Sequence, residues 1–320
     1  MAKEIHELHT PVALEYAIEM LGPALKGAAP IMVDGTLGLG GHTEAFLERF
    51  ENLTVIGIDR DERALELAAA RLARFGARVK FAHAIYSEIL EVLEDNDIAG
   101  ADAILLDLGV SSMQLDEADR GFAYSFDAPL DMRMNQNVGI TAAEVLNEYS
   151  ENELARIFKE YGEERHAKQV AKAVVERRKT EAFANSADLA TLVSKIVPFI
   201  PGKTTGHPAK RVFQALRIEV NGELSILEDT IPAAIEALNL GGRILVMSYH
   251  SLEDGIVKQA MVHAATSQTP IEMPIELPEH APVIRMLTKG TAVASDAEKE
   301  TNPRAASVRM RAAEKIRVAA

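Results

Sequence analysis

IMVDGTLGLGGHT, at residues 31–43, joins a short apolar run to a helix-like segment through a glycine-rich turn. Residues 31–34 predict a buried strand, and residues 42–50 predict a helix. Glycines let the backbone turn sharply and approach a ligand closely, and the first turn of a helix offers unpaired N–H groups. The stretch therefore predicts a strand, loop and helix unit suited to holding a ligand, with a tight connection that holds nothing as the alternative.

Strands and helices keep alternating after this unit. Further strands are expected at 53–59, 78–84 and 101–109, and helices at 61–75, closed by Gly76, and at 87–95. The continuous apolar core of 101–109 indicates burial on both faces. Alternation of this kind predicts an α/β fold with a parallel sheet and right-handed crossovers.

The alternation stops between residues 113 and 206, where a polar loop and helical segments at 142–162 and 165–179 follow. It resumes with a helical stretch at 209–238, a turn at the LGG of 240–242 and a strand at 243–250. A helix at 251–265 is expected to begin with Ser251 and Asp254 in capping-box spacing, and 307–316 predict a final strand. We therefore expect one α/β domain, at 1–112 and 207–320, interrupted by a helical insert at 113–206.

Composition narrows the function classes. Of the 320 residues, 48% are hydrophobic and none is cysteine, which fits a folded cytoplasmic chain and excludes disulfides, thiolate metal sites and a thiol nucleophile. No apolar run approaches the ~20 residues of a membrane span. Serine hydrolase and zinc hydrolase or deaminase classes lack their motifs, and no metal site is expected.

The net charge of -14 argues against a nucleic-acid partner, yet the basic residues are not spread evenly along the chain. Solvated helix faces would explain them, and so would a restricted basic surface for RNA. They gather in the insert and near the C-terminus, at Arg156, Lys159, Arg165, Lys168, Lys172, Arg177, Arg178 and Lys179, and at Arg304, Arg309, Arg311, Lys315 and Arg317.

Three acidic residues lie at the carboxyl ends of predicted strands: Asp34, Asp59 and Asp107. Asp59 comes about 20 residues after the glycines, where a carboxylate can accept hydrogen bonds from ribose hydroxyls, so a nucleoside ligand is expected. Thr43 stands where a dinucleotide fingerprint needs glycine, and His42 stands where a P-loop needs lysine. Because an aspartate beside the glycines repels a pyrophosphate but suits a sulfonium and an ammonium, S-adenosylmethionine fits the charges best.

Several blocks, in order along almost the whole chain, resemble the bacterial ribosomal RNA small subunit methyltransferase H family, RsmH or MraW. The blocks are DGTLGLGGHT, IDRD, LLDLGVSSMQLDEADRGFAYSFDAPLDMRM, YGEERHAKQVAKAVVERR, HPAKRVFQALRIEVNGEL, SYHSLED and NPRAAS. The resemblance implies a Rossmann-like class I methyltransferase fold with an antiparallel final strand. It also implies S-adenosylmethionine-dependent methylation of the exocyclic N4 of a cytidine in 16S rRNA, near the decoding site of the small ribosomal subunit.

The family's cofactor contacts carry over to matching positions of this chain, namely Gly40, Gly41, His42, Asp59, Tyr86, Asp107 and Gln114. Tyr86 departs from the usual Phe but keeps an aromatic ring for stacking beside the adenine. Ala306 of NPRAAS stands where the family usually has Arg, which puts an RNA contact by that side chain in doubt.

No catalytic residue is assigned from the sequence. The absence of cysteine excludes methylation of cytosine at C5 through a covalent adduct, whereas transfer to an amine mainly needs alignment of nitrogen, methyl carbon and sulfur. Asp107 could accept a hydrogen from the amine or serve only the cofactor, and His250 of SYHSLED is either a substrate contact or structural.

The alternatives to a methyltransferase are an NAD-dependent oxidoreductase and a non-catalytic RNA-binding assembly factor. Monomer and homodimer both remain open.

Overall fold

The structure is a computed structural model that describes residues 11–111, 113–114, 117–122, 127–199, 207–270 and 277–318. The N-terminal segment, parts of the LDLGVSS to DMRM block and the expected end of the insert at residue 206 lie outside the described residues. The chain divides into two compact units: unit 1 comprises Met1–Gly109 and Leu224–Ala320, and unit 2 comprises Val110–Glu223. Within the described residues, no helix is long and apolar enough to cross a bilayer.

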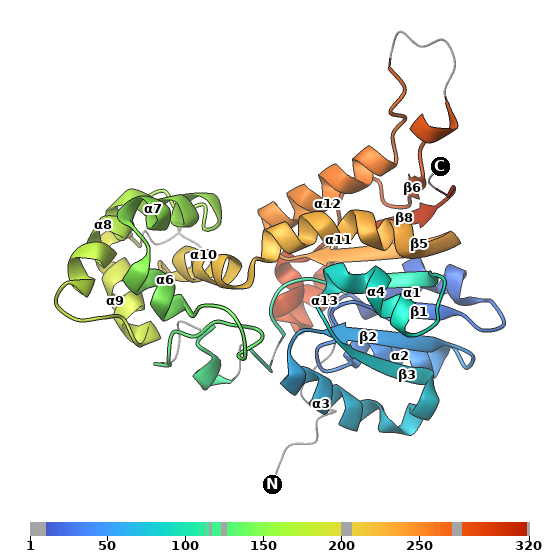
Figure 1. Cartoon of the computed structure of the whole chain (residues 1–320), viewed down its shortest axis with the longest axis horizontal. Helices are drawn as coiled ribbons and strands as arrows, with labels where there is room; N and C mark the ends of the chain where they lie inside the picture. The colour runs from blue at the N-terminus through green and yellow to red at the C-terminus, as the bar shows by residue number, and fades with distance from the viewer. Residues whose placement is uncertain are drawn as a thin grey trace. The chain divides into compact units, whose positions relative to one another are not determined.

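Unit 1 is built on an eight-stranded sheet with the order β3-β2-β1-β4-β5-β8-β6 and with β7 paired to β8 (Figure 1). The strands are β1 (Ile31–Asp34), β2 (Thr54–Asp59), β3 (Val79–His83), β4 (Ala101–Asp107), β5 (Leu238–Ser248), β6 (Ile284–Met286), β7 (Ala292–Val293) and β8 (Arg309–Lys315). The first five pair in parallel, and β8 runs antiparallel to β5. The order 3-2-1-4-5 is that of a doubly wound, Rossmann-like sheet.

Helices cover both faces of this sheet, as the apolar strands require. Along β4, Ala103 and Leu105 contribute to one core, whereas Ile104 and Leu106 contribute to the other. The first core includes α1 (Leu14–Leu21), α2 (Gly41–Arg49) and α3 (Glu62–Leu72), and the second includes α4 (Ile89–Asp95), α11 (Glu223–Ala237) and α12 (Ser251–Ala264). Short elements complete the unit: η2 (Gly22–Leu25), η3 (Ala73–Arg78), η4 (Tyr86–Glu88), η6 (Pro278–His280), α13 (Asp296–Thr301) and η7 (Pro303–Ser307).

The strands expected before residue 110 and the antiparallel final strand are confirmed, and several local predictions are wrong. Helix α3 ends at Leu72, so Gly76 lies inside η3 rather than at the helix cap. The expected LGG turn falls within β5, at a point where the pairing register with β4 shifts and Gly241 has φ 78°. The helical stretch expected at 209–238 is present and consists of two helices, because Gly222 takes a left-handed conformation (φ 60°) between them.

The capping box of α12 is shifted by one residue from its predicted position. His250 is the N-cap, and Glu253 is the third helical residue that bonds back to it. Asp254 instead forms a buried pair with Arg311, whose Nε and Nη2 lie 2.7 and 3.1 Å from the two carboxylate oxygens. The spacing of a capping box recurs in any polar helix start, so only the backbone geometry decides which pair forms it.

Unit 2 is helical, with η5 (Ala118–Arg120), α6 (Ala142–Glu148), α7 (Glu151–Glu160), α8 (Ala167–Arg178), α9 (Ser186–Ile196) and α10 (Lys210–Asn221). Capping boxes start α6 and α7, at Thr141 with Glu144 and at Ser150 with Glu153. The unit ends at Glu223 rather than at residue 206, because the apolar face of α10 is buried in its core. Helix α10 also holds the loop that precedes α6, since the Asn221 side chain bonds to the backbone of Met132 and Met134 at 2.8 Å.

Candidate functional site

The glycine-rich loop lies between β1 and α2, at the carboxyl edge of the sheet. The N–H of Gly35 donates to the Leu105 carbonyl at 2.9 Å, which keeps the loop against β4. A Cβ at Gly35 would lie 2.5 Å from Leu106 Cδ2, and Gly40 has φ +75°. Both positions therefore need glycine for packing or for backbone conformation. The loop leads directly into the first turn of α2, where Gly41 is the first helical residue.

Asp34 is the first of three carboxylates at this edge and is 1% exposed. It accepts a hydrogen bond from Thr43 Oγ1 at 2.7 Å, which ties the end of β1 to α2. Burial raises the pKa of Asp34, although His42 and the Thr43 bond act in the opposite direction. Asp34 thus combines a structural role in the loop with a negative charge beside it.

Asp59, at the end of β2, holds the loop from the other side. Its two carboxylate oxygens accept the backbone N–H groups of Gly38 and Asp61, each at 2.8 Å. Burial raises its pKa to about 6, despite these bonds. An ionised carboxylate has about four acceptor positions, so two remain for hydroxyl groups of a ligand. This donor-poor, acceptor-rich arrangement fits a ribose diol.

Asp107, at the end of β4, has partners on several elements. The Tyr249 hydroxyl donates to its Oδ1 at 2.6 Å, and its backbone N–H donates to Thr36 Oγ1 at 2.6 Å. His42 Nδ1 lies 3.8 Å from its Oδ2. Burial raises the pKa of Asp107, and His42 and the Tyr249 bond lower it. The carboxylate is fixed in place while its side chain stays 25% exposed.

The other predicted cofactor residues fall in two places. Tyr86 opens η4 after β3, and its Cβ lies 3.4 Å from where a Gly35 Cβ would be, so its ring starts beside the loop. Gln114 belongs to unit 2, where it is buried and its Oε1 accepts the Ser111 N–H at 3.0 Å. The structure thus brings six of the seven predicted contacts to the sheet edge of unit 1.

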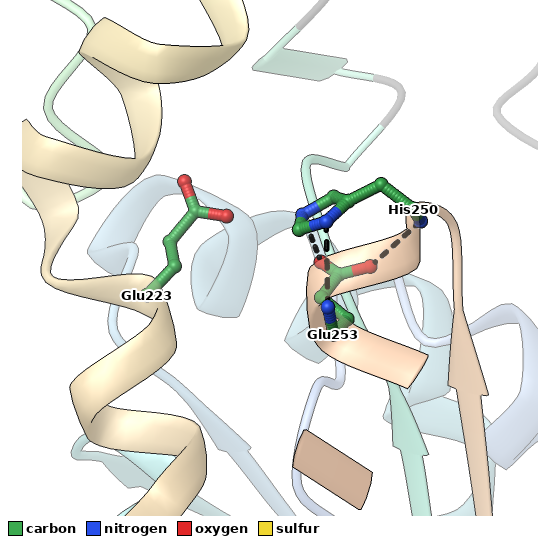
Figure 2. Close-up of side chains that lie close together, drawn as sticks. All are labelled: Glu223, His250 and Glu253. Atoms are coloured by element: carbon green, nitrogen blue, oxygen red, sulfur yellow. Dashed lines mark hydrogen bonds and ion pairs between the residues drawn. The ribbon is translucent and has the colours of Figure 1, made fainter. Parts of the chain in front are cut away.

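The SYHSLED block begins at the last residue of β5, and its His250 has a structural role at the start of α12. Figure 2 shows its imidazole beside Glu253, whose Oε2 accepts the backbone N–H of Tyr249 at 2.7 Å and of His250 at 3.2 Å. His250 Nδ1 in turn accepts the Glu253 N–H at 3.4 Å, and its Nε2 lies 3.1 Å from Glu253 Oε1 without hydrogen-bond geometry. Glu223, drawn in the same view, pairs within unit 2 with Arg217 at 2.9 and 3.0 Å.

Tyr249 is the site residue that the sequence analysis missed. It lies in the quoted SYHSLED block, but His250 was the residue of that block considered as a substrate contact. A signal was available, since an aromatic residue at the end of a strand next to β4 reaches the same sheet edge as Asp107. What the sequence could not give was the pairing of β4 with β5 across the insert.

The electrostatics of this edge suit a cation. Asp34 repels both Asp59 and Asp107, and each of the three has its pKa raised chiefly by burial. A positively charged group placed among them would relieve that repulsion, because opposite charge favours the ionised carboxylate. A sulfonium and an ammonium supply such charge, whereas a pyrophosphate would add to the repulsion.

The doubly wound sheet, the glycine loop and the strand-end carboxylates define a Rossmann-like class I methyltransferase that depends on S-adenosylmethionine. More narrowly, the chain belongs to the MraW methylase family, whose model matches residues 6–316.

Several curated relatives carry the name ribosomal RNA small subunit methyltransferase H. The one from Pseudarthrobacter chlorophenolicus is 53% identical over 320 residues, covering 98% of this chain and 97% of that protein. The one from Nocardia farcinica is 54% identical over 314 residues, covering 97% of each. A solved rRNA methylase from Streptococcus thermophilus is 12% identical and covers 99% of both chains, with a TM-score of 0.38.

Proposed function

We propose that this chain transfers a methyl group from S-adenosylmethionine to the exocyclic N4 of a cytidine in 16S rRNA, near the decoding site of the small ribosomal subunit. The observation that carries the proposal is the edge formed by Asp34, Asp59 and Asp107 around the glycine loop, in a chain that shares more than half its residues with methyltransferases named for this rRNA. The absence of cysteine supports an amine as acceptor, because a C5 transfer would need a thiolate adduct.

The residues of unit 1 would bind the cofactor through its separate parts. Asp59 would accept the ribose hydroxyls, and Tyr86 would stack beside the adenine. Gly40, Gly41 and His42 would let the amino-acid end approach the first turn of α2. The bound cofactor supplies an activated methyl group, so the chain mainly has to orient the target nitrogen and exclude water. Asp107 and Gln114 complete the proposed contacts.

We further propose that unit 2 supplies the RNA-binding surface. Several of its basic residues have structural bonds: Arg178 donates to the Leu146 and Tyr149 carbonyls, and Arg177 to the Asp188 carboxylate. Others are exposed and make no hydrogen bond or ion pair with the described residues: Lys159, Arg165, Lys168 and Lys172. Lys168 and Lys172 share one face of α8, where two cations at helical spacing can follow a phosphate backbone.

The C-terminal basic cluster contributes less than the sequence suggests. Arg311 and Lys315 are each 6% exposed. Arg311 pairs with Asp254, and Lys315 Nζ donates to the Glu236 and Leu238 carbonyls at 2.7 Å each. These two cations pair with groups within unit 1. An extended RNA surface would therefore have to rely on exposed members of the cluster such as Arg317 and Arg309, and Arg309 Nη1 also lies 3.5 Å from Asp254 Oδ2.

The central test is to incubate the protein with labelled S-adenosylmethionine and small subunits that lack the modification, and then to map the labelled nucleoside. Label on cytidine N4 of 16S rRNA is expected. Label on another base or on protein would refute the substrate assignment while leaving the cofactor in place. Because the chain is acidic overall and its basic surface is restricted, we also propose that it prefers the assembled particle to free RNA. Naked 16S rRNA is the comparison substrate, and equal methylation of both would contradict this preference.

The RNA surface has its own test in the double variant Lys168→Ala/Lys172→Ala. We expect a higher KM for subunits and a shallower dependence of log KM on log salt, because each lost phosphate contact reduces that slope by about 1. The matched control is Lys179→Ala, whose ammonium already pairs with Glu176 at 2.8 Å. Equal effects in the two variants would contradict the assignment of α8.

A further inference from the structure

Tyr249 has no assigned role, yet it makes the shortest side-chain bond to Asp107. It follows β5, which pairs with β4 so that Met247 lies opposite Asp107. Its hydroxyl donates to Asp107 Oδ1 at 2.6 Å, the short length of a bond to an ionised oxygen. Burial, together with the Asp107 charge, raises the pKa of Tyr249, so the phenol keeps its proton and remains a donor. The bond occupies Oδ1 and leaves Oδ2 available.

His42 presents an acceptor next to that second oxygen. Its Nε2 lies 2.9 Å from the Val12 carbonyl, which can only accept, so the ring hydrogen of a neutral imidazole belongs on Nε2. Nδ1 is then a bare acceptor, 3.8 Å from Asp107 Oδ2, and this separation is too long for a direct hydrogen bond. In the part of the chain that the structure describes, neither of these two atoms accepts a hydrogen bond.

We propose that Tyr249 is a positioning residue, which fixes Asp107 so that its Oδ2 and His42 Nδ1 form a two-acceptor site for a primary amino group. The inference rests on the proposed function and deepens it. A nitrogen about 2.9 Å from each acceptor fits between atoms 3.8 Å apart, and it needs at least two hydrogens to satisfy both. A hydroxyl group, with one hydrogen, would leave one acceptor unpaired.

Two sources share this chemistry, the exocyclic amine of the target base and the ammonium of the cofactor. If the base supplies the amine, the site also selects the extent of reaction. A methylated amine keeps one hydrogen and can satisfy only one of the two acceptors, so the product is held less well than the substrate. A second transfer to the same nitrogen is then disfavoured.

The test is Tyr249→Phe, which removes only the hydroxyl. Its matched control is Tyr149→Phe in unit 2, where a phenol likewise donates to a carboxylate, Glu219 Oε1 at 2.9 Å. Calorimetry measures binding of S-adenosylhomocysteine and of 5′-methylthioadenosine, which lacks the amino acid. Steady-state assays with unmodified small subunits give kcat and KM. Loss of a hydrogen bond to a charged group is expected to cost about tenfold in the affected quantity.

The two sources give different results. If the base supplies the amine, kcat falls about tenfold and S-adenosylhomocysteine binds as before. If the cofactor supplies it, S-adenosylhomocysteine binds about tenfold more weakly and 5′-methylthioadenosine is unaffected. Wild-type behaviour in every assay, or an equal loss for both nucleosides, would overturn the inference. If wild-type protein methylates no subunits, the proposed function fails on its own. In that case weaker binding of S-adenosylhomocysteine alone by the variant would still support the inference, whereas unchanged binding of both nucleosides would overturn it.

The pH profile gives a readout that a merely structural tyrosine would not move. The titratable groups that face Asp107 are His42 of α2, Asp34 of β1 and Glu253 of α12, and these remain in the variant. Removing the phenol removes a bond that lowers the pKa of Asp107, so the acidic limb of the profile should move to higher pH. The profile of Tyr149→Phe should overlay that of the wild type.

Discussion

Protonation of Asp59 provides the sharpest test of the cofactor site, because the expected effect can be calculated. Both of its oxygens accept backbone N–H groups, and a ribose diol would need the remaining acceptor positions. A protonated carboxyl has lost one of these positions to its own hydrogen. Since burial raises the pKa of Asp59 to about 6, this loss occurs under conditions in which the protein can be studied.

The size of the effect follows from that pKa. At about pH 5, one unit below it, roughly one tenth of Asp59 is ionised, whereas at about pH 8 nearly all of it is. If only the ionised form binds, affinity falls about tenfold between these conditions, or about 1.4 kcal/mol. The direction of the effect follows from the raised pKa: affinity is highest above the pKa of Asp59 and falls as the pH drops through it.

Isothermal titration calorimetry with S-adenosylhomocysteine across this range measures the step. Asp59→Asn should bind more weakly at every pH, because its amide nitrogen would face a backbone N–H donor, and the step near pH 6 should disappear. Asp296→Asn, on an exposed part of α13, is the control and should keep the step. An affinity that is the same at both ends of the range in wild type, or an unchanged step in Asp59→Asn, would refute the role of this carboxylate.

Three further predictions concern stability, each measured by urea denaturation. Gly35→Ala should lose about 1–3 kcal/mol, because the new Cβ would lie 2.5 Å from a leucine methyl carbon, and Gly27→Ala, with open space there, should lose less; equal losses would contradict the packing argument. Asp254→Ala should cost about 3–5 kcal/mol, because it leaves the buried arginine of β8 without its bidentate partner, and Asp296→Ala should have no measurable effect. Without ligand, the stability of Asp59→Asn relative to wild type should increase as the pH rises from about 4 to about 6, because the raised folded-state pKa makes ionisation costly there; a constant difference would refute this.

Much of the site could be predicted from residues that are neighbours in the sequence. The glycine loop, the strand before it and the helix after it form one local unit, and turn chemistry and apolar periodicity are local signals. Asp34, Asp59 and Asp107 were found because parallel strands bring their carboxyl ends to one edge, whatever the lengths of the connections. The antiparallel direction of the final strand was predicted from the family resemblance, because the sequence of one strand does not show the direction in which it pairs.

Contacts between distant segments were beyond prediction. Tyr249 and Asp107 are 142 residues apart, with the whole of unit 2 between them in the chain. Two other features were misjudged for the same reason: the polar residue that caps α12, and the basic residues that are buried. In both cases the partner of a side chain depends on what packs against it. Arg311 and Lys315 look like surface cations in the sequence, but the fold encloses them beside Asp254 and two backbone carbonyls.

The sequence by itself therefore determined the class of fold, the cofactor loop and its acidic neighbours, because these depend on short-range patterns and on the one rule that parallel strands share an edge. Only the tertiary structure decided which atoms remain available at that edge. Burial set the protonation of Asp59, the Val12 carbonyl set the ring hydrogen of His42, and the register of β4 with β5 placed Tyr249 on Asp107. Each of these depends on atoms brought together across long stretches of chain.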